Sequence, residues 1–139
     1  MKSTTILALI LGLQLAIVHA VAVKFSLYWE ISWFDNLMHL FGGVVLSLLF
    51  YTLVDIHMLR QRFVQSAWLV SGLVLFVLIG WEVLGVLMLM RFKEGFIVDT
   101  SLDLVFGILG SIIGWFIGRQ LKKLELWKVS SDFTVGSAV

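Results

Sequence analysis

Six ionisable side chains stand inside, or at the edges of, strongly apolar stretches of this 139-residue chain: His19, Asp35, His39, Glu82, Asp99 and Asp103. Asp35 and His39 open one such stretch, WFDNLMHLFGG, and their spacing of four residues places them on one face of a helix. Asp99 and Asp103 have the same spacing at the start of another stretch. An unpartnered charge in hydrocarbon costs about 2.5 to 3.5 kcal/mol even on the most lenient scale. Each group must therefore face protein, water, a metal ion or a bound partner.

A set of carboxylates and imidazoles is typical of a divalent cation site. Carboxylate and water suit Mg²⁺, Ca²⁺ or Mn²⁺, while an added imidazole admits Zn²⁺ or Fe²⁺. The predicted metal ligands are Asp35, His39, Glu82 and Asp103, with His19 as an additional candidate. Glu82 and Asp99 are the predicted catalytic residues, and Asp99 either supports a ligand or acts as a general base. Such a metal lowers the pKa of a bound water or polarises a phosphoryl or carbonyl oxygen.

Several of these groups also have ordinary structural explanations. Asp35 and Asp99 lie at predicted helix starts, where an acid caps free N–H groups and suits the helix dipole. His39 could bond to a neighbouring helix, and His19 lies close enough to the lipid head groups to be hydrated. Glu82 and Asp103 both lie within apolar helices. Neither helix capping nor hydration at the head groups therefore explains them. Without a metal, crowded carboxylates would share protons and suit a proton relay.

The composition is that of a membrane protein. Hydrophobic residues make up 60% of the chain and charged residues 14%, and the mean hydropathy is +1.05. Soluble domains are about half apolar and about a quarter charged. The absence of cysteine excludes disulfides and cysteine-ligated zinc. A net charge of +1 without a basic run argues against a nucleic acid partner.

Four apolar segments predict membrane-spanning helices at about residues 4–23, 35–54, 66–90 and 99–118. Each is close to the roughly 20 residues that cross a hydrocarbon core of about 30 Å, and none alternates as a transmembrane strand does. The predicted fold is therefore all-α: a polytopic membrane protein with a four-transmembrane-helix bundle in a single domain, residues 1–128. Residues 129–139 are predicted to be a flexible C-terminal tail. The first segment could also be a cleaved signal peptide, but its apolar run is long for one.

Basic residues in the loops set the orientation, because they concentrate on the cytoplasmic side. The side that holds both termini carries Lys2, Arg60, Arg62, Arg119, Lys122, Lys123 and Lys128. The opposite side carries Lys24, Arg91 and Lys93. The predicted topology is therefore N-in/C-in. The predicted location is a bacterial inner or plasma membrane, with the lipid bilayer as the surrounding partner.

Alternation of the spans brings the ionisable groups to one depth. At 1.5 Å per residue, His39, Glu82 and Asp103 all fall within roughly the outer third of the bilayer. The inner halves contain no comparable group, and Asp55 is assigned to a polar linker, residues 55–65. The sequence therefore predicts one polar site near the outer leaflet.

Small residues continue the polar faces of two spans. Gly43 and Ser47 follow His39, and Asp103 is followed by Gly107, Gly110, Ser111, Gly114 and Gly118. Small residues at this spacing let helices approach closely in lipid. The pattern predicts that the polar face points into the bundle, although the same glycines could pair two copies in a homo-oligomer.

The segments FDNLMHLFGG, GWEVLG and DTSLDLVFGILGSIIG together resemble the VanZ-like superfamily of small bacterial membrane proteins, most nearly its YjdF-like branch. The resemblance covers roughly residues 33–118, and Asp99-Thr100-x-x-Asp103 is its most specific part. It implies a shared polar site at Asp35, His39, Glu82, Asp99 and Asp103.

Two positions depart from the pattern: Asn36 stands where lysine is frequent, and Gly107 lacks a nearby asparagine. The founding member is associated with lowered sensitivity to teicoplanin, and YjdF-like proteins have no assigned activity. The resemblance therefore implies a site in the cell envelope without supplying a reaction.

The leading functional prediction is a metal-dependent membrane hydrolase or transferase that acts on a lipid or lipid-linked envelope substrate. One alternative is a transport or ligand-binding module in which the acids bind a proton or cation without turnover. The absence of a polar stripe toward the inner side argues against a conduit. The other alternative is a non-catalytic scaffold whose carboxylates bond to one another and to helix ends.

Overall fold

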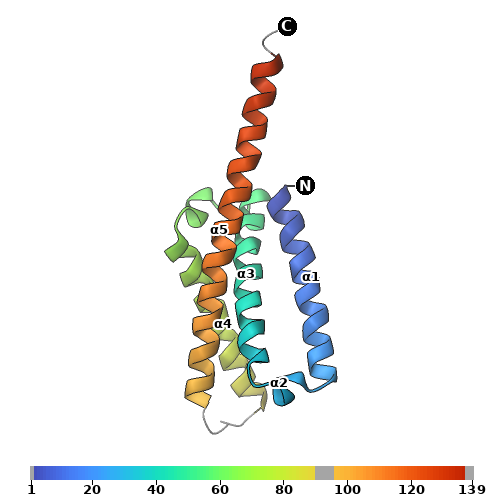
Figure 1. Cartoon of the computed structure of the whole chain (residues 1–139). Helices are drawn as coiled ribbons and strands as arrows, with labels where there is room; N and C mark the ends of the chain where they lie inside the picture. The colour runs from blue at the N-terminus through green and yellow to red at the C-terminus, as the bar shows by residue number, and fades with distance from the viewer. Residues whose placement is uncertain (1, 90–95, 137–139) are drawn as a thin grey trace.

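The computed structural model describes residues 2–89 and 96–136, which form helices, turns and no strand (Figure 1). The elements in chain order are α1 (Ser3–Lys24), α2 (Leu27–Glu30), α3 (Phe34–Asp55), the 3₁₀ helix η1 (Gln61–Val64), α4 (Ala67–Leu89) and α5 (Phe96–Gly136). Within the described residues, α1, α3, α4 and α5 are long and apolar enough to cross a membrane. The predicted all-α, four-helix membrane bundle is confirmed.

The predicted spans agree with α1, α3 and α4 to within one or two residues. The structure differs at the fourth span, because α5 begins at Phe96 and is helical as far as Gly136, through most of the predicted tail. The chain contains no proline, and no glycine stands between Gly118 and Gly136 to end the helix. Residue 90 of the third predicted span and residues 137–139 of the tail lie outside the described residues. So do Arg91 and Lys93, and the orientation of the bundle stays a prediction.

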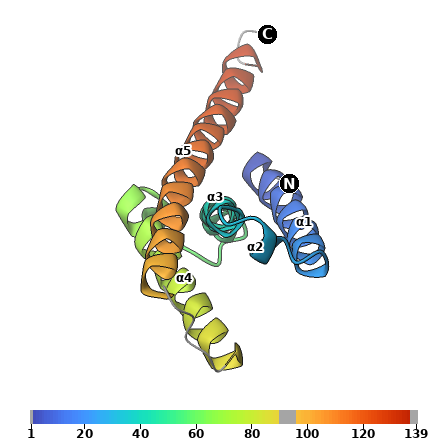
Figure 2. The same ribbon diagram turned by 60° about the horizontal axis from the view of Figure 1, so that its bottom comes forward.

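Helix α3 is the centre of the bundle. Figure 2 shows it nearly end-on, with α1 on one side and α4 and α5 on the other. Both termini lie at one end of the molecule, and α2 lies at the opposite end (Figure 1). We call these the termini end and the α2 end. Every other long helix packs against α3, so the side chains of α3 meet groups from all of them.

The glycines of α5 pack directly on the backbone of α3. A Cβ atom added at Gly110 would overlap the carbonyl oxygen of Leu40, and one added at Gly114 would lie 2.5 Å from the carbonyl oxygen of Val44. Ser47 Oγ donates a hydrogen bond to the carbonyl oxygen of Ser111 at 2.9 Å across the same contact. The predicted close approach of these two helices is confirmed. Because α3 fills the glycine face within one chain, a homo-oligomer would have to use another surface.

Asp55 differs from its prediction as part of a polar linker. It is the last residue of α3, and its side chain is 3% exposed. It accepts hydrogen bonds from the hydroxyls of Thr4 at 2.5 Å and Thr5 at 3.1 Å, and it pairs with the ammonium groups of Lys122 and Lys2. These groups come from α5 and from the start of the chain, so the burial of Asp55 depends on tertiary packing. The contacts tie α1, α3 and α5 together at the termini end.

Replacing Lys122 with methionine is expected to destabilise the bundle by roughly 2 to 3 kcal/mol. The change leaves the buried Asp55 carboxylate with Lys2, itself 52% exposed, as its remaining cation. Lys123→Met is the matched control, because Lys123 is the next residue of α5 and is exposed. Thermal unfolding in detergent measures the difference, and equal losses in the two variants would contradict the assignment.

Candidate metal centre

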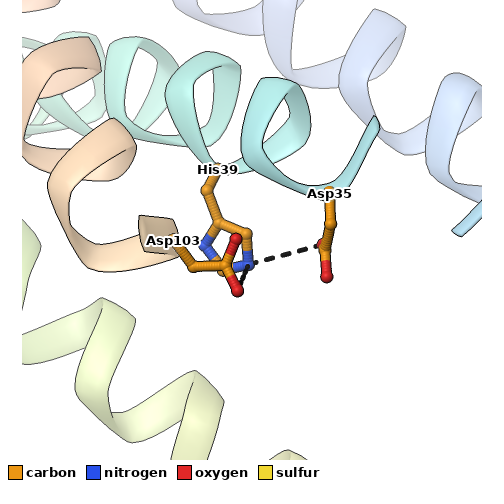
Figure 3. A group of neighbouring side chains, drawn as sticks. All are labelled: Asp35, His39 and Asp103. Atoms are coloured by element: carbon orange, nitrogen blue, oxygen red, sulfur yellow. Dashed lines mark ion pairs between the residues drawn. The ribbon is translucent and has the colours of Figure 1, made fainter. Parts of the chain in front are cut away.

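Four of the predicted site residues meet at the α2 end of the bundle, around the imidazole of His39. His39 Nε2 lies 3.6 Å from Asp35 Oδ1, 3.5 Å from Glu82 Oε1 and 3.9 Å from Asp103 Oδ2. Figure 3 shows the Asp35 and Asp103 carboxylates next to the His39 ring, each joined to it by a dashed line. Ligand atoms of Asp35, His39 and Asp103 all lie within 4.8 Å of one another. We call these four residues the acid–histidine cluster.

Two local features of the sequence bring the cluster together. Asp35 and His39 lie one turn apart near the start of α3, where the Asp35 charge also suits the helix dipole. Asp103 lies one turn before Gly107 in α5, and a Cβ added at Gly43 would overlap the Gly107 carbonyl oxygen. Gly43 in turn lies one turn after His39. The glycine contact therefore sets how closely Asp103 approaches His39.

The spacing of the cluster is too wide for direct hydrogen bonds and suits an interposed cation. Charge-assisted N–H···O bonds span about 2.7 to 2.9 Å, shorter than any of the three distances from His39 Nε2. Two ligands on a tetrahedral ion at about 2.1 Å are about 3.4 Å apart. The separations from His39 Nε2 are 3.6 Å to Asp35, 3.5 Å to Glu82 and 3.9 Å to Asp103, all slightly longer than that value.

Burial gives the same indication. His39 is 9% exposed and Asp103 2% exposed. Within residues 2–89 and 96–136, Asp103 Oδ1 is buried without a hydrogen-bond partner. A buried carboxylate oxygen without a partner is costly, because the group loses its hydration and gains nothing in return. A cation held between these groups would remove that cost.

Glu82 is the member of the cluster that α4 supplies. One of its carboxylate oxygens, Oε1, faces His39, and the other, Oε2, accepts a hydrogen bond from Thr100 Oγ1 at 3.2 Å. Its side chain is 19% exposed, more than that of His39 or Asp103. Thr100 therefore orients Glu82, a role that the sequence pattern did not predict.

Asp99 is not brought into the cluster. It is exposed in the first turn of α5, and within the described part of the chain it forms no ion pair with the cluster. Its neighbour Thr100 makes the contact with Glu82 instead. The catalytic role predicted for Asp99 stays a prediction, and the geometry favours Glu82 for it.

His19 also lies apart from the ligand group. Its Nδ1 is 2.7 Å from the hydroxyl of Tyr28, and its ring meets Trp81 edge-on, with 6.4 Å between ring centroids. Burial and the nearby charge of Asp35 raise the pKa of Tyr28 above its usual value, so the phenol stays protonated at neutral pH. Tyr28 was not predicted as a site residue because it lies in α2, outside the apolar segments. His19 and Tyr28 instead border a cavity of about 570 Å³ that Asp35 and His39 also line.

Comparison with known proteins identifies a family for most of the chain. A family model described as "Predicted membrane protein (DUF2238)" matches residues 2–123. The matched range includes all four residues of the acid–histidine cluster and the glycines of α5 that position them. No curated protein and no solved structure matches the chain.

Proposed function

Since the chain belongs to the DUF2238 family of predicted membrane proteins, we propose that its acid–histidine cluster binds a divalent cation and catalyses hydrolysis or group transfer on a lipid or lipid-linked substrate. One observation carries the proposal. Donor atoms of Asp35, His39 and Asp103 converge within 4.8 Å, and the buried Asp103 Oδ1 has no hydrogen-bond partner among the described residues. Because the site lies in a membrane protein, lipids are the molecules that surround it, and we take them as the substrate class.

The donor set favours Zn²⁺, with Mn²⁺ and Mg²⁺ as the alternatives. One imidazole with carboxylates is a borderline set that Zn²⁺ accepts, whereas Mg²⁺ prefers oxygen donors alone. Three protein ligands with an open position are typical of catalytic zinc sites. Asp35, His39 and Asp103 would be these ligands.

Glu82 supplies the acid–base chemistry in this proposal. Its Oε1 lies beside His39 and its other oxygen accepts a hydrogen bond from Thr100, so these two contacts hold the carboxylate next to the three ligand candidates. A metal held by Asp35, His39 and Asp103 would supply Lewis-acid chemistry and lower the pKa of a nearby water, and Glu82 would act as the general base that accepts a proton. Should Glu82 instead bind the metal as a fourth ligand, the site would be closed and structural.

The resemblance to the VanZ-like superfamily, and to its YjdF-like branch, is part of the same proposal. It rests on the short segments that contain Asp35, His39, Glu82 and Asp103, the residues of the cluster. It supports a cell-envelope substrate and a bacterial inner or plasma membrane as the location.

Metal analysis of the purified protein tests the proposal directly. After mild chelation and reloading, the wild-type chain is expected to bind one equivalent of Zn²⁺, measured by calorimetry and elemental analysis. A variant with Glu82→Gln and Asp103→Asn is expected to bind none, because it loses one buried ligand and the neighbouring carboxylate. Asp99→Asn is the control, since Asp99 is an exposed acid of the same helix that forms no ion pair with the cluster within the described residues. Equal metal content in all three proteins, or none in the wild type, would overturn the assignment.

Two further assays separate the alternative functions. Metal-loaded protein in lipid vesicles is expected to release a head group or acyl chain, detected by mass spectrometry, and the chelated protein is expected to release none. Proton or cation flux into vesicles that disappears in Glu82→Gln, without lipid turnover, would favour a transporter. Metal-independent stability with neither turnover nor flux would favour a scaffold.

A further inference from the structure

An apolar cavity of about 570 Å³ lies along α3, between α1 and α4. His19, Tyr28, Asp35 and His39 line it at the α2 end, and the walls farther from that end are apolar. Its lining on α3 runs from Asp35 to Leu49, about 21 Å at 1.5 Å per residue. The cavity therefore extends from the acid–histidine cluster across about two thirds of a hydrocarbon core about 30 Å thick.

Small residues create this space. Gly12 and Ala16 of α1 and Gly42 of α3 all line it. A Cβ atom added at Gly42 would meet nothing within 4 Å, so the missing side chain leaves open volume beside α3. The contrast with Gly110, whose added Cβ would overlap the backbone of Leu40, shows that the two glycines serve different purposes. Gly110 permits close packing, whereas Gly42 keeps a space open.

We propose that this cavity, which we call the chain groove, binds one hydrocarbon chain of a membrane lipid and places the lipid's polar head at the acid–histidine cluster. This inference rests on the proposed function for the role of the cluster, and it names the substrate class. The substrate is an amphiphile with a long unbranched or prenyl chain next to a phosphate or ester.

The chemistry of the walls excludes a polypeptide occupant. An extended peptide in the groove would leave its backbone N–H and C=O groups without partners in an apolar site. A helix about 10 Å wide and about 20 Å long occupies about 1,600 Å³, close to three times the volume of the groove. A helix of a second copy of this chain therefore cannot lie wholly inside the groove.

A hydrocarbon chain fits both the volume and the walls. A methylene group is similar in size to a water molecule, which takes up about 30 Å³. The groove therefore holds roughly 19 methylene groups. A methylene chain needs no hydrogen bonds, so apolar walls suit it. The polar residues are confined to one end, as an amphiphile with one head and one chain requires.

Aromatic residues border the head-group end. Tyr28 and Trp81 both line the groove. Tyr28 forms a hydrogen bond with His19, and the Trp81 ring makes an edge-to-face contact with it. Tyrosine and tryptophan suit the depth at which head groups meet hydrocarbon. These contacts join α1, α2 and α4 at the point where a head group would pass the groove to reach His39.

Photo-crosslinking tests the groove. The wild-type chain is reconstituted in phosphatidylglycerol vesicles that contain a trace of the same lipid with a diazirine at the end of one acyl chain. After illumination, mass spectrometry is expected to locate labels on groove residues away from the cluster, such as Gly12 and the buried Val45. Gly42→Leu places a side chain in the groove beside α3 without a backbone clash and is expected to lower this labelling roughly tenfold, because the acyl chain can no longer pass that point. Gly80→Leu is the matched control, because Gly80 is exposed on α4 outside the groove lining and its added Cβ also meets nothing within 4 Å.

The outcomes separate the groove from the metal site. Labelling confined to lipid-exposed faces, equal labelling in Gly42→Leu and Gly80→Leu, or crosslinks between two protein chains at Gly12 or Val45 would overturn the groove. Normal Zn²⁺ binding by Gly42→Leu, together with lost labelling, is the expected result. Groove labelling in a wild-type chain that binds no metal would refute the proposed function and leave the groove standing. Should Gly42→Leu fail to fold, Ala16→Leu fills the same groove from α1.

Discussion

Replacing Gly110 with leucine is expected to prevent the bundle from assembling. A Cβ atom at this position would overlap the carbonyl oxygen of Leu40, which is main chain and cannot rotate away. Leu40 follows His39 directly, so separating the helices at this point would also move Asp103 from His39. Overpacking a well-filled contact typically costs about 1 to 3 kcal/mol, and a clash between two helix backbones is expected to exceed that range.

Size-exclusion chromatography and thermal unfolding in detergent measure this effect. Gly72→Leu is the matched control, because Gly72 is exposed on α4 and its added Cβ would meet nothing within 4 Å. Since glycine is a poor helix former, the control is expected to be as stable as the wild type or slightly more stable. A Gly110→Leu variant that is monodisperse and unfolds at the control's temperature would contradict the packing of α5 on α3.

Replacing Asp103 with asparagine is expected to reverse the effect of metal on stability. Without metal, the variant is expected to be more stable than the wild type by about 1 to 2 kcal/mol, because it removes a buried carboxyl group that lies among other carboxylates. At a metal concentration of 1,000 times the dissociation constant, the wild type is expected to gain about 4 kcal/mol. The variant, which lacks a ligand, is expected to gain little.

The measurement is a pair of unfolding curves for each protein, one with chelator and one with Zn²⁺. Asp99→Asn is the control, since it removes an exposed acid from the same helix and is expected to keep the metal response. If Asp103→Asn is less stable than the wild type in chelator, Asp103 has a structural role in the metal-free protein. If metal stabilises Asp103→Asn as much as the wild type, Asp103 is not a ligand.

Hydropathy predicts the spans well because each helix must match the thickness of one bilayer. The bounds of α1 and α3 agree with the apolar segments to within one residue at each end. Beyond the bilayer this constraint disappears, and the continuation of α5 to Gly136 follows from the absence of a helix-ending residue. Asp55 shows a second limit. Its burial depends on Thr4 and Lys122, which are far away in the sequence, and a linker with the same residues would be equally consistent with the sequence.

The depth of the site residues is predictable, whereas their direction around each helix is not. Alternation of the spans places His39, Glu82 and Asp103 at one level, and the structure brings them together. Successive residues of a helix point about 100° apart, so the contact of α5 with α3 decides whether Asp99 or Thr100 faces Glu82. The four-residue spacing from Asp103 assigns Asp99 to the site. In the packed structure, Thr100 contacts Glu82 instead. The chain groove was not predictable for a related reason, since it depends on the separation of α1 and α4.

The packing of α5 on α3 also has a consequence for synthesis. Leu40 and Gly110, which meet in the finished bundle, are about 70 residues apart in the chain. At about 5 to 20 residues per second, a ribosome needs about 4 to 14 s to make the intervening segment. During that time the surface of α3 around His39 lacks both its glycine-rich cover and the carboxylate of Asp103. The last helix to be synthesised therefore completes both the packing and the site, and a nascent chain arrested before it holds an imidazole in the membrane without its buried carboxylate partner.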